Sequence, residues 1–293
     1  MSIKIIGQTF CRGCWGRRFH REMKSPVKPR RQIGLTLRRR TIITLLESVL
    51  IGLVSGQSHA GSLDSVEQLI VSVAPAWDSS SGKLQRFERA GSGWKPAGDA
   101  IPVLYGKNGL VWGRGVLGTE EPGAHKSEKD KRAPAGVFRI GKIYTYDPEL
   151  PKGSAYPFRT VTKADAWIDD PSLPQYNQHV VIDDPANPPP WFDKQKMRHG
   201  DFAYRWLVEI RHNSDPPVAG AGSAIFFHIR RGPQRPSAGC TTMAEENLVT
   251  LIRWLRAEKN PHYVLLPREE YLAKWKAWGL PAASAIPELL GGS

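Results

Sequence analysis

The sequence contains little cysteine and no long apolar segment. Of the three cysteines in 293 residues, Cys11 and Cys14 lie near the N-terminus and Cys240 is the only one beyond them. The C-x-x-C spacing of the first two has no strand and helix around it, so it does not indicate a redox or metal motif. The longest apolar run, Thr41 to Val54, includes Glu47 and is shorter than the roughly 20 residues that a membrane-spanning helix needs. Beyond residue 60 no internal disulfide is possible.

The apolar run has the surroundings of a secretory signal peptide. Arg38-Arg39-Arg40 precedes it, and Ser58-His59-Ala60, a small-x-small cleavage site, follows it. We therefore expect residues 1–60 to be a leader and signal peptide with only transient membrane passage, and residues 61–293 to be the exported protein. Two alternatives remain open, because the run could stay as an uncleaved anchor and translation could start at Met23.

The chain lacks a concentration of positive charge outside this leader. The formal net charge is +13, from 41 Lys and Arg against 28 Asp and Glu. Twelve of the basic residues and two of the acidic ones lie in residues 1–60, which leaves residues 61–293 with a net charge of only +3. Binding to nucleic acid depends on concentrated positive charge, so we expect no nucleic-acid partner.

Cofactor-binding motifs are missing as well. The sequence has no phosphate-binding loop and no glycine fingerprint for a dinucleotide. Cys240 has no second thiol at C-x-x-C spacing, and His179, His199 and His212 are scattered. We therefore expect neither a metal site nor a cofactor.

Short segments typical of strands dominate residues 61–293. The predicted strands are 66–74, 83–90, 101–105, 110–116, 137–144, 202–211, 223–228 and 262–266. Their close spacing is typical of a meander and predicts a β-rich fold, a mixed sheet curled into a sandwich. Residues 146–198 carry many prolines, aromatic residues and aspartates, and an irregular segment of this length is usually functional or mobile. No repeat or linker argues for two domains, so residues 61–293 are expected to form one catalytic domain.

The pattern changes to a helix after Cys240. Apolar residues recur there at helical spacing, and Asn260-Pro261 ends the pattern. The apolar residues are Met243, Leu248, Leu251, Ile252 and Leu255. A second, short helix is predicted near residues 269–278.

Residues 225–243, which read IFFHIRRGPQRPSAGCTTM, hold the side chains best suited to catalysis. An apolar strand ends at His228, and a loop leads to Cys240, which we expect to open the helix. An imidazole and a helix N-terminus both stabilise a thiolate, so Cys240 is a candidate nucleophile and His228 its base. Gly239 lets backbone N–H groups approach a developing oxyanion. Singly, such a cysteine or histidine is more often structural, but together in an exported chain they favour catalysis.

The same run resembles the signature of the L,D-transpeptidases with a YkuD-type catalytic domain, in which a histidine precedes a [ST]-x-G-C motif. His228, Ser237, Gly239 and Cys240 match this signature position by position. Three further segments are similar to family sequences: 126–141 (KSEKDKRAPAGVFRIG), 167–177 and 222–228. The likeness extends from about residue 66 to about residue 280.

The resemblance implies a peptidoglycan L,D-transpeptidase of the periplasm or cell envelope, which forms cross-links or attaches an amine. Cys240 would attack the carbonyl of the third residue of a tetrapeptide stem, the terminal D-residue would leave, and an amine would resolve the thioester. Backbone N–H groups near Gly239, Cys240 and Thr241 would hold the oxyanion, and Ser237 would orient the loop or His228. Peptidoglycan stem peptides are the expected partners, and we expect a monomer.

Two positions depart from the family pattern. Many members have Gly directly after the histidine and Arg two residues after the cysteine, where this chain has Ile229 and Thr242. That Arg is thought to help to place the substrate. The loop residues Arg230, Arg231 and Arg235 could bind a substrate carboxylate instead, or they could form a solvated basic loop.

Weaker candidates lie in the irregular segment. Tyr176, with Trp167 and Trp191, could line a substrate groove, although core packing is the usual role of such residues. The pairs Asp169-Asp170 and Asp183-Asp184 could bind the amino group of a diamino acid. We interpret the second pair as a turn and leave the first open.

Other functions fit the same residues. With water as the acceptor, the protein would be an L,D-carboxypeptidase or a peptidoglycan hydrolase. A papain-like enzyme would place its cysteine before its histidine, and a sortase would be expected to keep a later essential Arg. Outside the enzymes, Ile229 and Thr242 leave open a wall-binding module that has lost catalysis.

The cleavage site gives a first testable prediction. The mature N-terminus is expected at Gly61 or within a few residues of it, because Ser58-His59-Ala60 follows the apolar run. N-terminal sequencing of protein taken from the cell envelope measures this. Intact residues 41–60 in that material would mean a membrane anchor.

Overall fold

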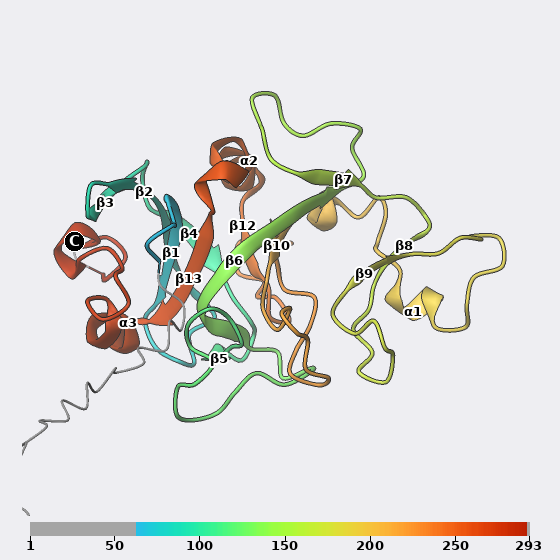
Figure 1. The fold of residues 1–293 in the computed structure, drawn as a ribbon, viewed down its shortest axis with the longest axis horizontal. Helices are drawn as coiled ribbons and strands as arrows, with labels where there is room; N and C mark the ends of the chain where they lie inside the picture. The colour runs from blue at the N-terminus through green and yellow to red at the C-terminus, as the bar shows by residue number, and fades with distance from the viewer. Residues whose placement is uncertain (1–62, 292–293) are drawn as a thin grey trace, which may run out of the picture. The chain divides into compact units, whose positions relative to one another are not determined.

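The computed structural model describes residues 63–291, in which strands outnumber helices (Figure 1). The strands are β1 (Gln68–Ala74), β2 (Ser81–Ala90), β3 (Gly93–Pro96), β4 (Ile101–Leu104), β5 (Leu110–Trp112), β6 (Ala133–Thr145), β7 (Phe158–Thr160), β8 (Asp165–Trp167), β9 (His179–Val181), β10 (Trp206–Ile210), β11 (Phe226–Ile229), β12 (Thr241–Met243) and β13 (His262–Pro267). The helices are α1 (Phe192–Gln195), α2 (Glu245–Trp254) and α3 (Arg268–Lys274), with the 3-10 turns η1 (Phe202–Tyr204), η2 (Ala257–Lys259) and η3 (Ala283–Ala285). No helix in the described part is long and apolar enough to span a membrane.

Eight of the strands form a closed ring. The hydrogen-bonded order runs from β1 through β13, β6, β10, β11, β12 and β4 to β2, which pairs in turn with β1. The β1–β13 and β11–β12 pairs are parallel, and the other pairs of the ring are antiparallel. The predicted β-rich fold with a mixed sheet is therefore confirmed.

Two parallel strands lie at the centre of the core. All seven residues of β1 and all six of β13 are buried. Helix α3 packs against both strands, and α2 packs against β11. Strands that are covered on both faces have no solvated side, which explains why β1 and β13 are apolar almost throughout.

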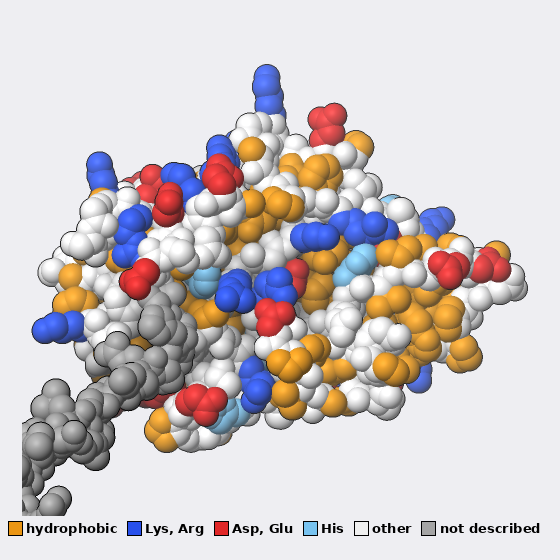
Figure 2. Space-filling view, viewed as in Figure 1, with side chains coloured by type: hydrophobic (Ala, Val, Ile, Leu, Met, Phe, Trp, Pro, Cys, Tyr) orange, Lys and Arg blue, Asp and Glu red, His pale blue; other side chains and the backbone are white. Residues whose placement is uncertain are grey.

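Residues 146–198 form a lobe beside the ring, to the right in Figure 1. The lobe contains β7, the two-stranded β8–β9 sheet and α1. Its own apolar cluster consists of Ala164, Ala166, Ile168, Ile182 and Phe192. A second cluster joins the lobe to the ring and consists of Tyr144, Val161, Trp167, Leu207 and Phe226. Figure 2 shows hydrophobic side chains gathered over the lobe, whereas acidic and basic side chains are interspersed over the rest of this face.

Asp165, at the start of β8, is a buried charge in the lobe. Its carboxylate accepts hydrogen bonds from Arg159 Nε at 2.5 Å, from His179 Nε2 at 2.6 Å and from the hydroxyl of Thr162 at 2.6 Å. Burial alone would raise the pKa of Asp165, but the hydrogen bonds outweigh burial and lower the pKa to about 2. The carboxylate is therefore charged at neutral pH and ties β7, β8 and β9 together.

Six of the eight predicted strands are confirmed with small shifts of their ends. The prediction for residues 110–116 was too long, because the chain leaves the ladder after Trp112. The first part of the predicted strand 202–211 forms η1 instead. There the Asp201 carboxylate accepts the Ala203 N–H at 3.1 Å and caps the turn.

The predicted helix after Cys240 is confirmed but is shorter than expected. Met243 belongs to β12, and α2 ends at Trp254. The buried side chain of Gln68 caps this end, because it donates to the Trp254 carbonyl at 2.8 Å and accepts the Arg256 N–H at 2.8 Å. A contact across the fold thus sets the end of the helix.

The Asp165 network generates a stability prediction. Asp165→Asn is expected to lower the free energy of unfolding at pH 7 by about 3 kcal/mol, because it removes the buried charge to which Arg159 and His179 donate hydrogen bonds. The folded-state pKa of about 2 lies below the usual 3.8, so this stabilisation is present above about pH 4 and is lost as the pH falls towards 2. Urea unfolding at several pH values measures both effects.

Asp193 supplies the matched control for this variant. It pairs with Lys196 at 2.9 Å on the surface, with 78% of its side chain exposed. Asp193→Asn is therefore expected to cost less than about 0.5 kcal/mol. Equal losses in the two variants would contradict the role given to Asp165.

Candidate functional site

Two neighbouring parallel strands bring His228 and Cys240 to one side of the sheet. In the register of β11 and β12, His228 lies opposite Thr242. Side chains alternate between the faces of a strand, so Cys240, two residues before Thr242, points to the same side as His228. Both residues line one cavity of about 430 Å³. Other residues that line it are Lys126, Glu128, Lys129, Asp169, Tyr204, Arg231, Arg235, Gly239 and Thr242.

The turn before Cys240 is held by Ser237. Its Oγ accepts the Gly239 N–H at 3.0 Å and lies 2.5 Å from the carbonyl oxygen of Cys240. Gly239 has a φ of +150°, and an added Cβ would lie 3.0 Å from the Arg132 carbonyl oxygen. Only glycine adopts this conformation readily, and only glycine has no side chain that would collide with the Arg132 carbonyl. Gly239 therefore lets the turn before Cys240 pass close to the neighbouring backbone.

The predicted position of Cys240 at the start of a helix is wrong. β12 follows Cys240 directly, and α2 begins only at Glu245. The residues between them remain extended because they pair with β11 and β4. A helix dipole acts over roughly its first turn, so α2 does not stabilise a thiolate at Cys240.

The thiol of Cys240 lies against the apolar cluster that joins the lobe to the ring. Burial raises the pKa of the thiol to about 11, although a backbone hydrogen bond at Phe226 and the charge of Lys126 act in the opposite direction. The Sγ–H group donates to the Ala224 carbonyl at 3.5 Å. The depressed thiol pKa expected from the sequence is therefore wrong for the resting protein, in which the thiol is protonated.

His228 is buried and neutral. Its Nδ1 lies 2.9 Å from the Ile229 carbonyl oxygen. A carbonyl can only accept, so Nδ1 carries the hydrogen and Nε2 carries the lone pair. Burial lowers the pKa of His228 to about 4, although the Ile229 carbonyl favours the charged ring. The ring edge packs against Tyr204 with the centroids 5.0 Å apart. The imidazole can thus accept a proton at neutral pH.

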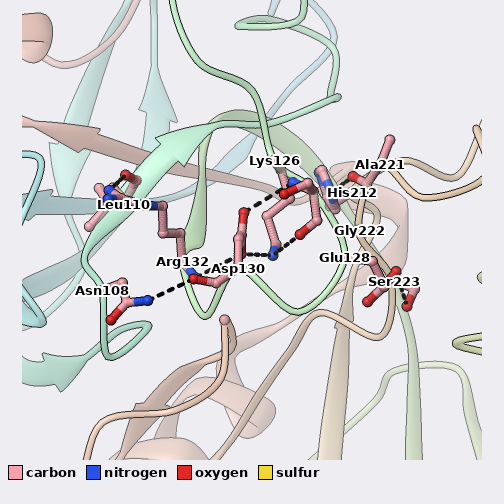
Figure 3. Close-up of polar contacts among 12 residues, drawn as sticks. Asn108, Leu110, Lys126, Glu128, Asp130, Arg132, His212, Ala221, Gly222 and Ser223 are labelled. Atoms are coloured by element: carbon pink, nitrogen blue, oxygen red, sulfur yellow. Dashed lines mark hydrogen bonds and ion pairs between the residues drawn. The ribbon is translucent and has the colours of Figure 1, made fainter.

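A buried ion pair lies under one wall of the cavity (Figure 3). The side chain of Lys126 is only 3% exposed and pairs with Asp130. The Lys126 ammonium also donates to the Ser127 carbonyl at 3.1 Å, and Asp130 accepts the Arg132 N–H at 2.8 Å. An added Cβ at Gly239 would lie 3.7 Å from Lys126 Cε. The pair therefore supports the turn that carries Cys240.

A second acidic group faces the cavity from the same segment. Glu128 accepts hydrogen bonds from the hydroxyl of Tyr176 and, at 3.0 Å, from the hydroxyl of Ser223. Figure 3 shows Glu128 and Ser223 beside each other and apart from the pair of Lys126 and Asp130. Tyr176 is buried, and burial and the Glu128 charge raise its pKa, so its hydroxyl stays a donor.

The structure separates the three loop arginines. Arg231 lines the cavity, but its guanidinium pairs with Asp201 at 2.6 Å. Arg235 lines the cavity with an exposed side chain and forms no ion pair with another described residue. Arg230 lines a different cavity of about 730 Å³, together with Lys83.

The two remaining predicted binding residues are in the interior. The hydroxyl of Thr241 lies 2.9 Å from the Tyr263 hydroxyl in the core, so only the backbone of Thr241 is near the turn. Tyr176 does not line the cavity itself, but its hydroxyl donates a hydrogen bond to Glu128, which does. Asp169, left open in the sequence, lines the cavity, whereas Asp184 accepts the Ala186 N–H at 2.9 Å, the hydrogen bond of a turn.

Several cavity residues had no functional assignment from the sequence, among them Glu128, Tyr204 and Thr242. Glu128 and Tyr204 carry no signal that distinguishes them from other surface residues. Thr242 was noted only as a departure from the family pattern. Its hydroxyl is buried and has no hydrogen-bond partner among the described residues.

Comparison with known proteins finds one matching family model. The family model of the L,D-transpeptidase catalytic domain, YkuD, matches residues 97–264, more than half of the chain. The matched span contains β11, β12 and the cavity residues described above. No curated protein and no solved structure matches the chain.

The raised pKa of the thiol generates a reactivity prediction. A free cysteine has a pKa of about 8.5, so at pH 7.5 the Cys240 thiol should react with iodoacetamide at least about tenfold more slowly. The rate should rise about tenfold per pH unit until the pH nears 11. Peptide mass analysis of the alkylated chain separates Cys240 from Cys11 and Cys14. The same chain in urea is the control, and a rate for folded Cys240 above that of unfolded Cys240 at pH 7.5 would contradict the protonated resting thiol.

Proposed function

The chain belongs to the L,D-transpeptidase family, and on that basis we propose that it is an exported enzyme that uses Cys240 to acylate and cross-link peptidoglycan stem peptides. One observation carries the proposal. A cysteine thiol and a neutral imidazole with the lone pair on Nε2 line the same cavity. This is the pairing that a thiol acyltransferase needs.

In the first half-reaction His228 acts as the base. The thiol turns from the Ala224 carbonyl towards Nε2, and Sγ bonds to the carbonyl carbon of the third stem residue while Nε2 takes the proton. The tetrahedral intermediate then collapses, the C–N bond to the terminal D-residue breaks, and the imidazolium returns the proton to the leaving amine. The product is a thioester on Cys240.

In the second half-reaction an amine of another stem replaces the leaving group. His228 Nε2 takes a proton from the attacking amine, the C–S bond breaks, and the thiolate recovers a proton from the imidazolium. The result is a new amide bond and the resting enzyme. The first half-reaction starts from the neutral thiol and imidazole, and the second one regenerates them, so no thiolate–imidazolium pair is stored between turnovers.

The oxyanion of each intermediate needs a backbone donor. The Gly239 N–H already donates to Ser237 Oγ at 3.0 Å. Thr241 belongs to the β11–β12 ladder, so we assign the oxyanion to the N–H group of Cys240, which follows the turn that Gly239 permits. Ser237 acts by holding this turn.

Arg235 is the best-placed group for a substrate carboxylate. It lines the cavity without an acidic partner among the described residues, whereas Arg231 is paired with Asp201. A guanidinium binds a carboxylate through two parallel hydrogen bonds. We therefore assign to Arg235 the binding of the substrate carboxylate, which the uncharged Thr242 cannot provide.

The proposal predicts a covalent acyl-enzyme. Incubating the full-length protein with a tetrapeptide stem should raise the protein mass by the mass of the stem minus the mass of the released free D-amino acid. Cys240→Ser should give no adduct and retain its fold by circular dichroism, because a hydroxyl is far less ionised. His228→Gln should slow acylation by about a hundredfold or more. Intact-protein mass spectrometry measures both.

Arg230→Ala is the control, because it removes a basic residue from the other cavity and should acylate at the wild-type rate. The released products distinguish the functions that share the site. A cross-linked dimer indicates a transpeptidase, and a tripeptide with a free D-residue indicates an L,D-carboxypeptidase. Binding of stems without any adduct would contradict the proposed enzymatic activity and would favour a wall-binding module.

A further inference from the structure

The carboxylate of Glu128 lies at the Cys240 cavity and has no ion-pair partner among the described residues. No Lys, Arg or His in residues 63–291 forms an ion pair with Glu128. Lys126, two residues before Glu128, forms its ion pair with Asp130. Lys129 also lines the cavity, but its side chain is exposed and forms no ion pair with Glu128. Glu128 therefore carries a negative charge that no described side chain pairs directly.

The protein nevertheless holds this carboxylate firmly. The two donors are neutral hydroxyls on buried side chains, those of Tyr176 and Ser223, and both bond to Oε2. The backbone N–H of Glu128 donates to the Gly220 carbonyl at 2.9 Å, so the main chain is fixed as well. Hydrogen bonds from neutral donors orient a carboxylate but leave its charge uncancelled. The Oε1 atom remains available to a ligand.

Thr242 gives an independent indication that the cavity takes a polar ligand. Thr242 lines the cavity and is only 2% exposed, and its buried hydroxyl has no partner in the described part of the chain. A buried hydroxyl without a partner is unfavourable, so such groups are usually completed by a ligand or by water. It lies opposite His228 in the strand register, beside the reacting atoms.

We propose that Glu128 is the binding group for a primary ammonium of the peptide that enters the Cys240 cavity. A primary ammonium supplies the charge and the N–H donors that the oriented carboxylate lacks. The chemistry has two sources in a stem peptide: the side-chain ammonium of a diamino acid in the acyl donor, or the amine of the acceptor. The inference rests on the proposed function for the peptide nature of the ligand.

Glu128→Gln separates recognition from structural support. The amide keeps an oxygen that accepts from Tyr176 and Ser223, so the fold should be kept, with a melting temperature within a few degrees of wild type. It removes the negative charge. Glu258→Gln, which changes an exposed glutamate in η2, is the matched control.

The experiment measures binding without turnover. The full-length protein with Cys240→Ala is titrated calorimetrically with two tetrapeptide stems, one with lysine and one with norleucine at the third position. Norleucine keeps the carbon chain and lacks the ammonium. The lysine stem should bind about tenfold more tightly, and Glu128→Gln in the same background should abolish the difference, whereas Glu258→Gln should leave it.

Two further arms with the intact nucleophile identify the source of the ammonium. If it belongs to the donor, Glu128→Gln slows acylation by the lysine stem and not by the norleucine stem. If it belongs to the acceptor, a preformed acyl-enzyme needs a higher amine concentration for half-maximal transfer. Either result supports the inference.

Equal affinities of the two stems, or no binding of either stem, would overturn the assignment. Failure of the proposed function looks different. It would appear as the absence of an adduct on Cys240 with any stem, while the preference for lysine in the Cys240→Ala protein would still report on Glu128.

Discussion

Cys240 and His228 line the same cavity because β12 lies parallel to β11 in a single register. The pairing of His228 with Thr242 puts three side chains on one side of the sheet, and a shift by one residue would turn Cys240 into the core. The turn before β12 must then lead the chain into the strand within a few residues. Gly239 therefore adopts a positive φ that residues with a side chain rarely adopt. The cavity, the turn and the candidate oxyanion donor all follow from this one strand pair.

The resting pair is neutral, and this changes how the site works. A thiol with a pKa of about 11 and an imidazole with a pKa of about 4 in the same cavity do not exchange a proton before a substrate is present. In the proposed mechanism the transfer becomes favourable only when Sγ forms its bond to carbon and the charge passes to the oxyanion. A backbone donor positioned in advance therefore matters more for the rate than a stored thiolate does.

The sequence predicts the parts of the fold that depend on local pattern. The buried strands, the helix after β12 and the pairing of His228 with Cys240 could be inferred from apolar periodicity and from a family signature. The ends of α2 could not, because Gln68 caps it from the far end of the chain. The thiol pKa was predicted with the wrong sign, since it depends on packing and on three residues of strand where a helix was expected. Glu128 is a similar case, because only the fold brings Tyr176 and Ser223 to it.

The lobe that looked irregular in sequence supplies the apolar wall of the site. Trp167, at the end of β8, packs edge-on against Phe226 with the ring centroids 4.8 Å apart, and Cys240 lies against this cluster. Asp165, two residues before Trp167, fixes the strand through Arg159 and His179. A buried charge in the lobe thus helps to hold the apolar wall against which the partly buried thiol lies. A protonated thiol reacts slowly with oxidants as well as with alkylating agents, so the same packing protects Cys240 from oxidation.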